Sequence, residues 1–483
     1  SPDDVGVSPG KPDERVDILM RYNGKLDQKP IMLPHVGSSD LAEFTVSHRL
    51  AEECTFEIFA FHKNRLFQHI GVSVYFCNHP NDFAMTPKMK IEMINMLRGD
   101  LSDFTDKKKY GSSIVFSDGL PIISKDLKIQ ELANEADIKQ FNDGIRYLIE
   151  DYVKSEKPDD EKLILALADE GRVFYQTVLK RDWKFDENPV QIISSTTSHF
   201  PLEFAYIGEL GPQVKSLCDK PKVQKALEEG KCCGCNKNGL KYICPLGFLS
   251  LRTIIERHRV GENVGLLKNR QLGIVENTVS LNRPPIPFMG KTVVGTSVNV
   301  DKVVSGLRSE VCKTIDKYSK QSREVKNWKE WLKAIEDDPD SLVIIGHVES
   351  AELRSRDSLE IGNDPITKRD LTDSYLRQES STIQPIVILI GCNTQDVNMS
   401  FMDFAQLFKS MGAAIVLSTF TKIRGSQAAP LVNKLFTILS VSKGEEIRFG
   451  EAILKLRRAL FAEGMYVSMA MVSHGDADWK LKL

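Results

Sequence analysis

A cysteine and a histidine each follow a glycine at the end of an apolar stretch. His347 follows Gly346 in SLVIIGHV, and Cys392 follows Gly391 in PIVILIGC. A thiol beside an imidazole is the minimum for nucleophilic catalysis, because the imidazole takes the proton and the thiolate attacks a carbonyl carbon. Backbone N–H groups nearby can hold the oxyanion. The two residues are candidates for a catalytic dyad, although either residue type is also often a plain buried group.

A run of cysteines is the second group that could do chemistry. Cys232 and Cys235 form a C-x-x-C pair, Cys244 follows, and Cys218 and His258 flank them. Zinc needs four tetrahedral nitrogen or sulfur ligands, and a C-x-x-C turn supplies two. We therefore expect Cys232, Cys235 and Cys244 to be candidate ligands of a structural zinc. A second C-x-x-C is missing, so plain thiols remain the alternative.

Residues 286–483 alternate apolar strands with amphipathic helices. The apolar stretches include TVVGTSV, SLVIIGHV, PIVILIGC and AAIVLSTF. Such stretches are typical of a mostly parallel sheet covered by helices on both faces, which predicts an α/β fold. Catalytic groups in such folds lie beyond the carboxyl ends of the strands. If the two strands were neighbours, His347 and Cys392 would come within reach of each other.

The N-terminal part has a different pattern. Its segments are short, aromatic and β-branched and are separated by Gly, Asn and Asp, which predicts strands. We expect a smaller β-rich domain over residues 17–125, preceded by a flexible segment over residues 1–16.

Residues 126–285 begin with a helical pattern. Apolar residues at helical spacing include Ile145, Ile149 and Val153. A Lys- and Cys-rich stretch then predicts an irregular insertion over residues 218–245.

The composition excludes several classes of protein. The chain of 483 residues carries 64 Lys plus Arg against 66 Asp plus Glu, for a net charge of −2. This near-neutral net charge gives the protein no strong electrostatic attraction to nucleic acid or to an anionic membrane. No apolar run reaches the roughly 18–20 residues that span a bilayer. The polar first residues have none of the apolar core that a signal peptide needs, so we expect a cytoplasmic protein. Motifs for nucleotide phosphates, zinc peptidases and serine hydrolases are missing.

Several stretches resemble, in wording and order, the CHAT family of caspase-like cysteine peptidases. Upstream, HFPLEFAYIGEL, with Pro201 and Glu203, looks like the start of the same domain. The resemblance covers about residues 126–483. The stretches that carry it are VIIGHVES, SLEIGNDPITKRDLTDSYL, ILIGCNTQ, FAQLFKSMGAAIVLSTF, GEAILKLRRALF and HGDADWKL.

The resemblance implies a caspase-like, mostly parallel sheet flanked by helices, with residues 286–483 as the catalytic half. It makes Cys392 the nucleophile and His347 the general base. Gly391 and Asn393 would shape the nucleophile loop, and the backbone N–H of Val348 would donate to the oxyanion. The family usually has glycine after the histidine, so the Val348 side chain is a departure that crowds the approach.

In function, the resemblance implies a cysteine endopeptidase that cleaves a specific protein partner. Bacterial members imply a role in antiphage defence or programmed cell death, for example activation of a pore-forming gasdermin-like protein. Catalysis would need no cofactor, and the β-rich domain would bind a partner or an activating signal. Two alternatives remain: an inert interaction scaffold, for which Val348 is the hint, and a small-molecule thiol hydrolase.

The sequence does not determine which residue the peptidase would prefer directly before the cleaved bond. Charged and polar residues follow the strands that end at His347 and at AAIVLSTF, but a solvated loop explains each of them equally well. We assign none of them to specificity. They are Arg354, Arg356, Asp357, Glu360, Asp364, Asp373, Ser418, Thr419, Lys422 and Arg424.

Overall fold

The structure is a computed structural model of the chain, and it describes most of the residues. Every structural statement below refers to these residues alone. They are residues 14–22, 25–33, 41–44, 53–75, 90–95, 110–117, 120–125, 128–132, 135–179, 185–194, 199–211, 214, 216–232, 234, 242–259, 266–269, 274–277, 285–350, 357–378, 380–381, 383–392, 401–421, 423–440 and 446–483. The predicted flexible segment 1–16 and the zinc candidate Cys235 lie largely or wholly outside them.

The C-terminal part is built on one large sheet with the strand order β17-β16-β18-β21-β22-β24. The first five strands run parallel, and β24 closes the edge antiparallel to β22. A hairpin of β19 and β20 pairs with the far end of β18. The bounds are β16 (Lys291–Thr296), β17 (Gln321–Val325), β18 (Ser341–Ser350), β19 (Asp357–Ile361), β20 (Asp364–Thr367), β21 (Ile386–Cys392), β22 (Ile415–Thr419) and β24 (Met471–His474).

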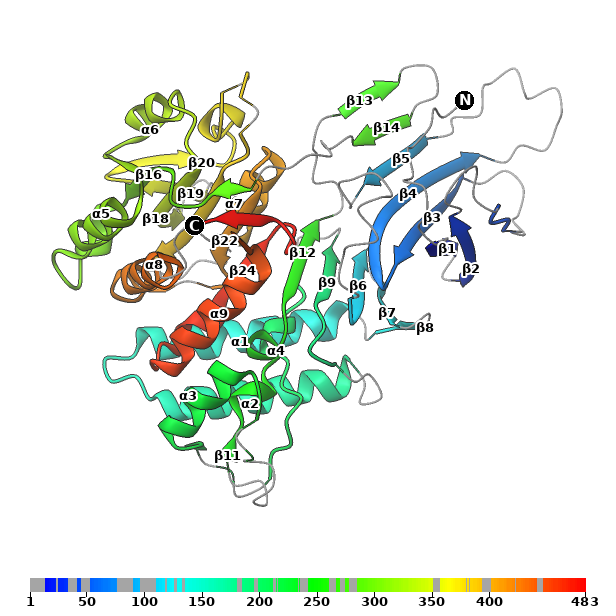
Figure 1. Ribbon diagram of the computed structural model, residues 1–483, viewed down its shortest axis with the longest axis horizontal. Coiled ribbons are helices and arrows are strands. Elements are labelled where there is room, and N and C mark those ends of the chain that lie inside the picture. Colours follow the sequence, from blue (N-terminus) through cyan, green and yellow to red (C-terminus); the bar gives the residue numbers. More distant parts are fainter. Residues whose placement is uncertain are drawn as a thin grey trace.

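Helices cover both faces of this sheet (Figure 1). Alternate residues of β18 belong to two different cores: Val343 and Ile345 pack into the larger one, and Leu342 and Ile344 pack into a smaller one. The larger core includes residues of α5 (Leu307–Tyr318) and α8 (Gly425–Ser440), whereas the smaller core includes residues of α6 (Trp328–Ile335) and α7 (Phe401–Ser410). The predicted α/β fold, a mostly parallel sheet between helices, is confirmed.

The β-rich N-terminal region is also confirmed. Seven strands form a sheet with the order β13-β14-β5-β4-β3-β1-β2. Two of them, β13 and β14, come from much later in the chain than the rest. The bounds are β1 (Glu14–Tyr22), β2 (Lys25–Leu33), β3 (Glu53–His62), β4 (Arg65–Tyr75), β5 (Lys90–Asn95), β13 (Leu266–Asn269) and β14 (Ile274–Asn277).

A third sheet, with the order β12-β9-β6-β7-β8, connects the other two parts. Strands from both sides of the predicted boundary at residue 125 pair in it, since β7 ends at Lys125 and pairs with β8. That boundary therefore does not follow the sheets. The bounds are β6 (Ser112–Ser117), β7 (Leu120–Lys125), β8 (Lys128–Glu131), β9 (Val190–Ser194) and β12 (Ile255–Arg259).

The helical pattern predicted around Ile145 is present in α1, where Ile145, Ile149 and Val153 are buried. No helix in the described part of the chain is long and apolar enough to cross a membrane. The remaining elements are α1 (Glu135–Lys154), α2 (Asp160–Thr177), α3 (Lys220–Glu229), α4 (Leu249–Arg252), α9 (Phe449–Ala462), β10 (Ser216–Leu217), β11 (Tyr242–Ile243), β15 (Ile286–Pro287), β23 (Glu446–Arg448) and β25 (Lys480–Lys482).

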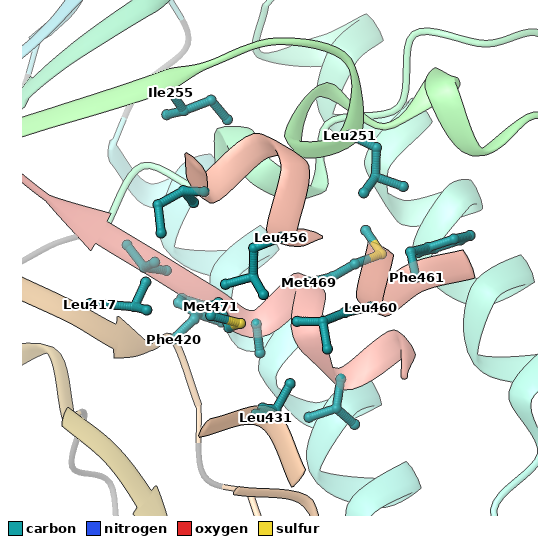
Figure 2. Close-up of a cluster of buried hydrophobic side chains, with 14 of the residues drawn as sticks. Leu251, Ile255, Leu417, Phe420, Leu431, Leu456, Leu460, Phe461, Met469 and Met471 are labelled. Carbon is teal, nitrogen blue, oxygen red and sulfur yellow. The ribbon is translucent and has the colours of Figure 1, made fainter. Parts of the chain in front are cut away.

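The parts predicted as residues 126–285 and 286–483 share one hydrophobic core. Figure 2 shows Leu251 and Ile255 from the first part beside Leu456 and Met469 from the second. A backbone bridge between Arg257 and Gly475 joins the edge strand β12 to the residue after β24. The sheet that contains His347 and Cys392 is therefore packed firmly against the rest of the molecule.

Candidate active site

His347 and Cys392 lie opposite each other at the carboxyl end of the parallel pairing between β18 and β21, and β18 itself continues to Ser350. β18 and β21 pair without interruption from Ser341 and Ile386 to His347 and Cys392. Adjacent strands lie about 4.8 Å apart. The pairing thus brings together the two residues whose types fit a thiol–imidazole dyad.

Strand alternation assigns these two register positions to one face of the sheet. Residues two apart on a strand share a face, and Val343 and Ile345 in β18 pack into the larger core, as Ile388 and Ile390 do in β21. Residues 347 and 392 continue these two series. The His347 side chain is buried, with 3% of its surface exposed.

Gly346 and Gly391 precede the dyad residues and are also register partners. A Cβ atom at Gly346 would lie 2.4 Å from Leu359 Cδ1, so the glycine allows the hairpin strand β19 to pack closely against β18. Gly391 is buried, and its carbonyl accepts a hydrogen bond from Ile423 N at 3.2 Å. The small residue before His347 therefore serves the close packing of β19 against β18.

The predicted oxyanion and loop residues are described to different extents. Gly391 lies within β21, and the backbone of Val348 lies within β18, where it pairs with Leu359 of β19. Asn393 lies outside the described residues. Their catalytic roles stay predictions.

Glu360 is a residue of this site that the sequence did not single out. It is the register partner of His347 in β19, on the side away from Cys392. Its side chain is buried, and Oε1 accepts hydrogen bonds from Ser297 Oγ and from Asn299 Nδ2, the latter at 3.0 Å. The sequence signal was weak, because Glu360 is one of several charged residues between the two dyad positions.

The cysteine cluster is partly assembled. The Sγ atoms of Cys232 and Cys244 lie 3.5 Å apart, although the two residues are separated along the chain. The two flanking residues make other contacts. The Cys218 thiol donates to the Ile243 carbonyl at 3.5 Å, and His258 Nε2 lies 3.0 Å from Glu256 Oε1. Among the described residues no group of three or more His, Cys, Asp or Glu could hold a metal ion. Zinc binding stays a prediction that depends on Cys235.

Glu203, which the resemblance places at the start of the domain, is fully buried and pairs with Arg257. Burial alone would raise the pKa of its carboxyl, but the charges of Arg257 and Arg457 and the hydrogen bonds to the carboxylate together outweigh burial and lower it. His199 and His474 lie in the same region, and burial, together with Arg257, lowers the pKa of both imidazoles, that of His474 to about 3. Arg457 of α9 lies 3.7 Å from Glu203, so this buried cluster also joins the parts before and after residue 286.

No family model matches the chain, and no curated protein matches it. Among solved structures, the chain is similar to gingipain R, an Arg-specific cysteine proteinase, with 10% identity, 78% of this chain and 79% of that chain covered, and a TM-score of 0.36. The complex of the Porphyromonas gingivalis RgpB pro- and mature domains gives 10% identity, coverage of 71% and 77%, and a TM-score of 0.34. The Saccharomyces cerevisiae separase–securin complex gives 9% identity, coverage of 77% and 30%, and a TM-score of 0.39.

Proposed function

We propose that the protein is a CHAT-type, caspase-like cysteine endopeptidase that uses His347 and Cys392 as its catalytic dyad. The observation that carries the proposal is the register pairing of these two residues at the carboxyl end of the parallel pairing between β18 and β21. This is the edge of an α/β sheet at which catalytic groups lie.

In the proposed reaction the His347 imidazole takes the proton of the Cys392 thiol. The thiolate then attacks the carbonyl carbon of a peptide bond and forms a tetrahedral oxyanion, which backbone N–H groups at Gly391, Asn393 and Val348 would stabilise. The imidazolium returns the proton to the leaving amine, and water hydrolyses the thioester. No cofactor takes part in these steps.

The biological setting belongs to the same proposal. The substrate would be a specific protein partner in the cytoplasm, in bacterial antiphage defence or programmed cell death, with a gasdermin-like pore-forming protein as an example. The seven-stranded N-terminal sheet would bind a partner or an activating signal. The resemblance supports the first assignment, whereas the second rests on the position of the N-terminal region and on its lack of catalytic residues.

The test compares the protein with its Cys392→Ala variant on a complex proteome, with new peptide N-termini identified by mass spectrometry. Termini that share a preferred residue at the cut and disappear with the variant would establish the peptidase. Circular dichroism and thermal unfolding of both proteins show that the variant is folded. An inert scaffold would produce no new termini with either protein, and a small-molecule thiol hydrolase would turn over esters while leaving proteins intact.

A further inference from the structure

Glu360 is a buried carboxylate beside the proposed dyad that the proposed reaction does not use. It lies opposite His347 in the β18–β19 pair, and Cys392 lies opposite His347 in the β18–β21 pair. Leu359 and Ile361 pack into the smaller core, so Glu360 between them belongs to the other face, the one that carries His347. Glu360, His347 and Cys392 therefore occupy adjacent register positions on the three neighbouring strands β19, β18 and β21.

The carboxylate of Glu360 is held in place on one side only. Oε1 accepts hydrogen bonds from Ser297 Oγ and Asn299 Nδ2, both in the segment that follows β16. Among the residues that the structure describes, no Lys, Arg or His forms an ion pair with Glu360, and no donor contacts Oε2. Only 9% of the residue surface is exposed.

A buried carboxylate without a cation is energetically costly, and hydrogen bonds from neutral donors compensate only part of that cost. Among the described residues no cation contacts Glu360, and one that arrives with a substrate would supply this partner. Glu360 lies two strand spacings from Cys392, or roughly 10 Å between backbones. The long side chains of Lys and Arg carry their charge at the end of a flexible apolar stem and have the reach for such a position.

We propose that Glu360 is the specificity residue of this site and binds the ammonium or guanidinium group of a Lys or Arg directly before the scissile bond. This inference rests on the proposed peptidase function and names the substrate class of that site. Ser297 and Asn299 fix the carboxylate through Oε1 and leave Oε2 for the substrate cation.

A positioning role for Glu360 makes a different prediction. A carboxylate that orients the His347 imidazole would affect the cleavage of every substrate equally. Both hydrogen bonds that Glu360 accepts among the described residues come from Ser297 and Asn299 rather than from His347, which favours the specificity role.

The experiment uses the full chain and internally quenched peptides that differ only in the residue before the cut, which is Arg, Lys or the neutral norleucine. We expect kcat/KM to be about 100-fold higher for Arg and Lys than for norleucine, as is typical when a buried charge pair forms. Glu360→Gln keeps the side-chain shape and an acceptor for Ser297 and Asn299. It should lower kcat/KM for Arg and Lys by far more than kcat/KM for norleucine, and so remove the preference for a basic residue. Glu310→Gln, the same chemical change at an exposed position of α5, should change nothing.

The outcomes separate this inference from the proposed function. Cleavage by the wild type without a basic preference would overturn the Glu360 assignment and leave the peptidase standing. An equal loss for all three peptides in Glu360→Gln would also overturn it, in favour of a positioning role. If Glu360→Gln does not fold, Glu360→Asp keeps the charge and should retain the basic preference at a lower kcat/KM.

A binding measurement tests the same contact without turnover. A peptidyl-arginine aldehyde should protect Cys392 from alkylation at a concentration at least 10-fold lower than the matching norleucine aldehyde. This difference should disappear in Glu360→Gln. Equal protection by both aldehydes in the wild type would overturn the inference even if no protein substrate is cleaved.

Discussion

Arg65 and Asp476, 411 positions apart in the sequence, form a buried ion pair, with 3.0 Å between Arg65 Nη2 and Asp476 Oδ1. Arg65 is the first residue of β4 in the N-terminal sheet, whereas Asp476 follows β24 at the edge of the sheet that carries the dyad. The same guanidinium contacts Glu256 in β12 and Asp478. One guanidinium thus contacts three carboxylates, from segments that belong to or follow strands of different sheets.

Replacing Arg65 by methionine should destabilise the protein strongly. The change removes the Arg65 cation from the buried carboxylates of Glu256 and Asp476, and loss of one partner of a buried ion pair typically costs about 3–5 kcal/mol. Urea unfolding of wild type and Arg65→Met measures the change. The matched control, Arg15→Met, removes a half-exposed pair with Asp17 and should cost less than about 1 kcal/mol. Equal effects of the two variants would contradict a structural role for the junction.

The buried imidazole of His474 should make the protein less stable in mild acid. Burial, together with Arg257, lowers the pKa of His474 to about 3, so the folded state disfavours the charged form. The stability that follows from a neutral His474 is present in full above the unfolded pKa of about 6.5 and is lost as pH falls from there toward 3.

Unfolding in urea at pH 7.5, 6.0 and 5.0 measures this dependence. We expect His474→Phe to reduce the slope of stability against pH compared with wild type. The measurement at pH 7.5, where the imidazole is neutral in both states, serves as the reference. Identical slopes in the two proteins would contradict the lowered pKa.

Gly362 should be irreplaceable in the hairpin that carries Glu360. It has a φ of +63°, and a Cβ atom there would lie 2.1 Å from the Lys326 carbonyl oxygen. Gly362→Ala therefore combines backbone strain with a clash against main chain. Gly464→Ala is the control, because Gly464 also has a positive φ but has nothing within 4 Å of an added Cβ.

We expect Gly464→Ala to lower the free energy of unfolding by about 1–2 kcal/mol, the typical cost of a left-handed conformation without glycine. Gly362→Ala should cost clearly more and should also lower cleavage, because it displaces Glu360. Chemical denaturation and peptide cleavage assays report the two effects. A Gly362→Ala variant as stable as Gly464→Ala would mean that the hairpin adapts.

If the cysteine cluster binds structural zinc, protein prepared under reducing, chelator-free conditions should contain about one zinc per chain. Cys232→Ser and Cys244→Ser should each lower the metal content, since their sulfurs lie 3.5 Å apart. Cys312→Ser, at a thiol outside the cluster, should leave it unchanged. Elemental analysis well below one zinc per chain in the wild type would leave the cluster as plain thiols.

The sequence predicted the parts of the fold that follow from periodicity. The apolar stretches SLVIIGHV and PIVILIGC predicted buried parallel strands, and the helical spacing around Ile145 predicted α1. The placement of β13 and β14 beside β5 could not be predicted, because strand pairing between distant segments depends on tertiary packing. For the same reason the predicted domain boundary at residue 125 falls between β7 and β8, two strands that pair with each other.

The sequence predicted those site residues whose type suits catalysis and which directly follow an apolar stretch. His347 and Cys392 each follow an apolar stretch of the sequence, so their positions in the sheet could be predicted, although β18 continues past His347 to Ser350. Glu360 could not, because its place beside His347 depends on the register of an antiparallel hairpin. The partners of Asp476 were equally hidden, since Arg65 lies at the other end of the chain.

Alkylation of the cysteines, followed peptide by peptide, tests the His347–Cys392 pairing most directly. Cys312 is the internal reference, because burial and the nearby Glu324 raise the pKa of its thiol to about 12 and keep it protonated at neutral pH. We predict that Cys392 reacts faster than every other thiol at pH 7, and that His347→Ala removes this advantage while Cys312 keeps its slow rate. Reaction of Cys392 at the rate of an ordinary thiol in the wild type, or at an unchanged rate in folded His347→Ala, would contradict the dyad.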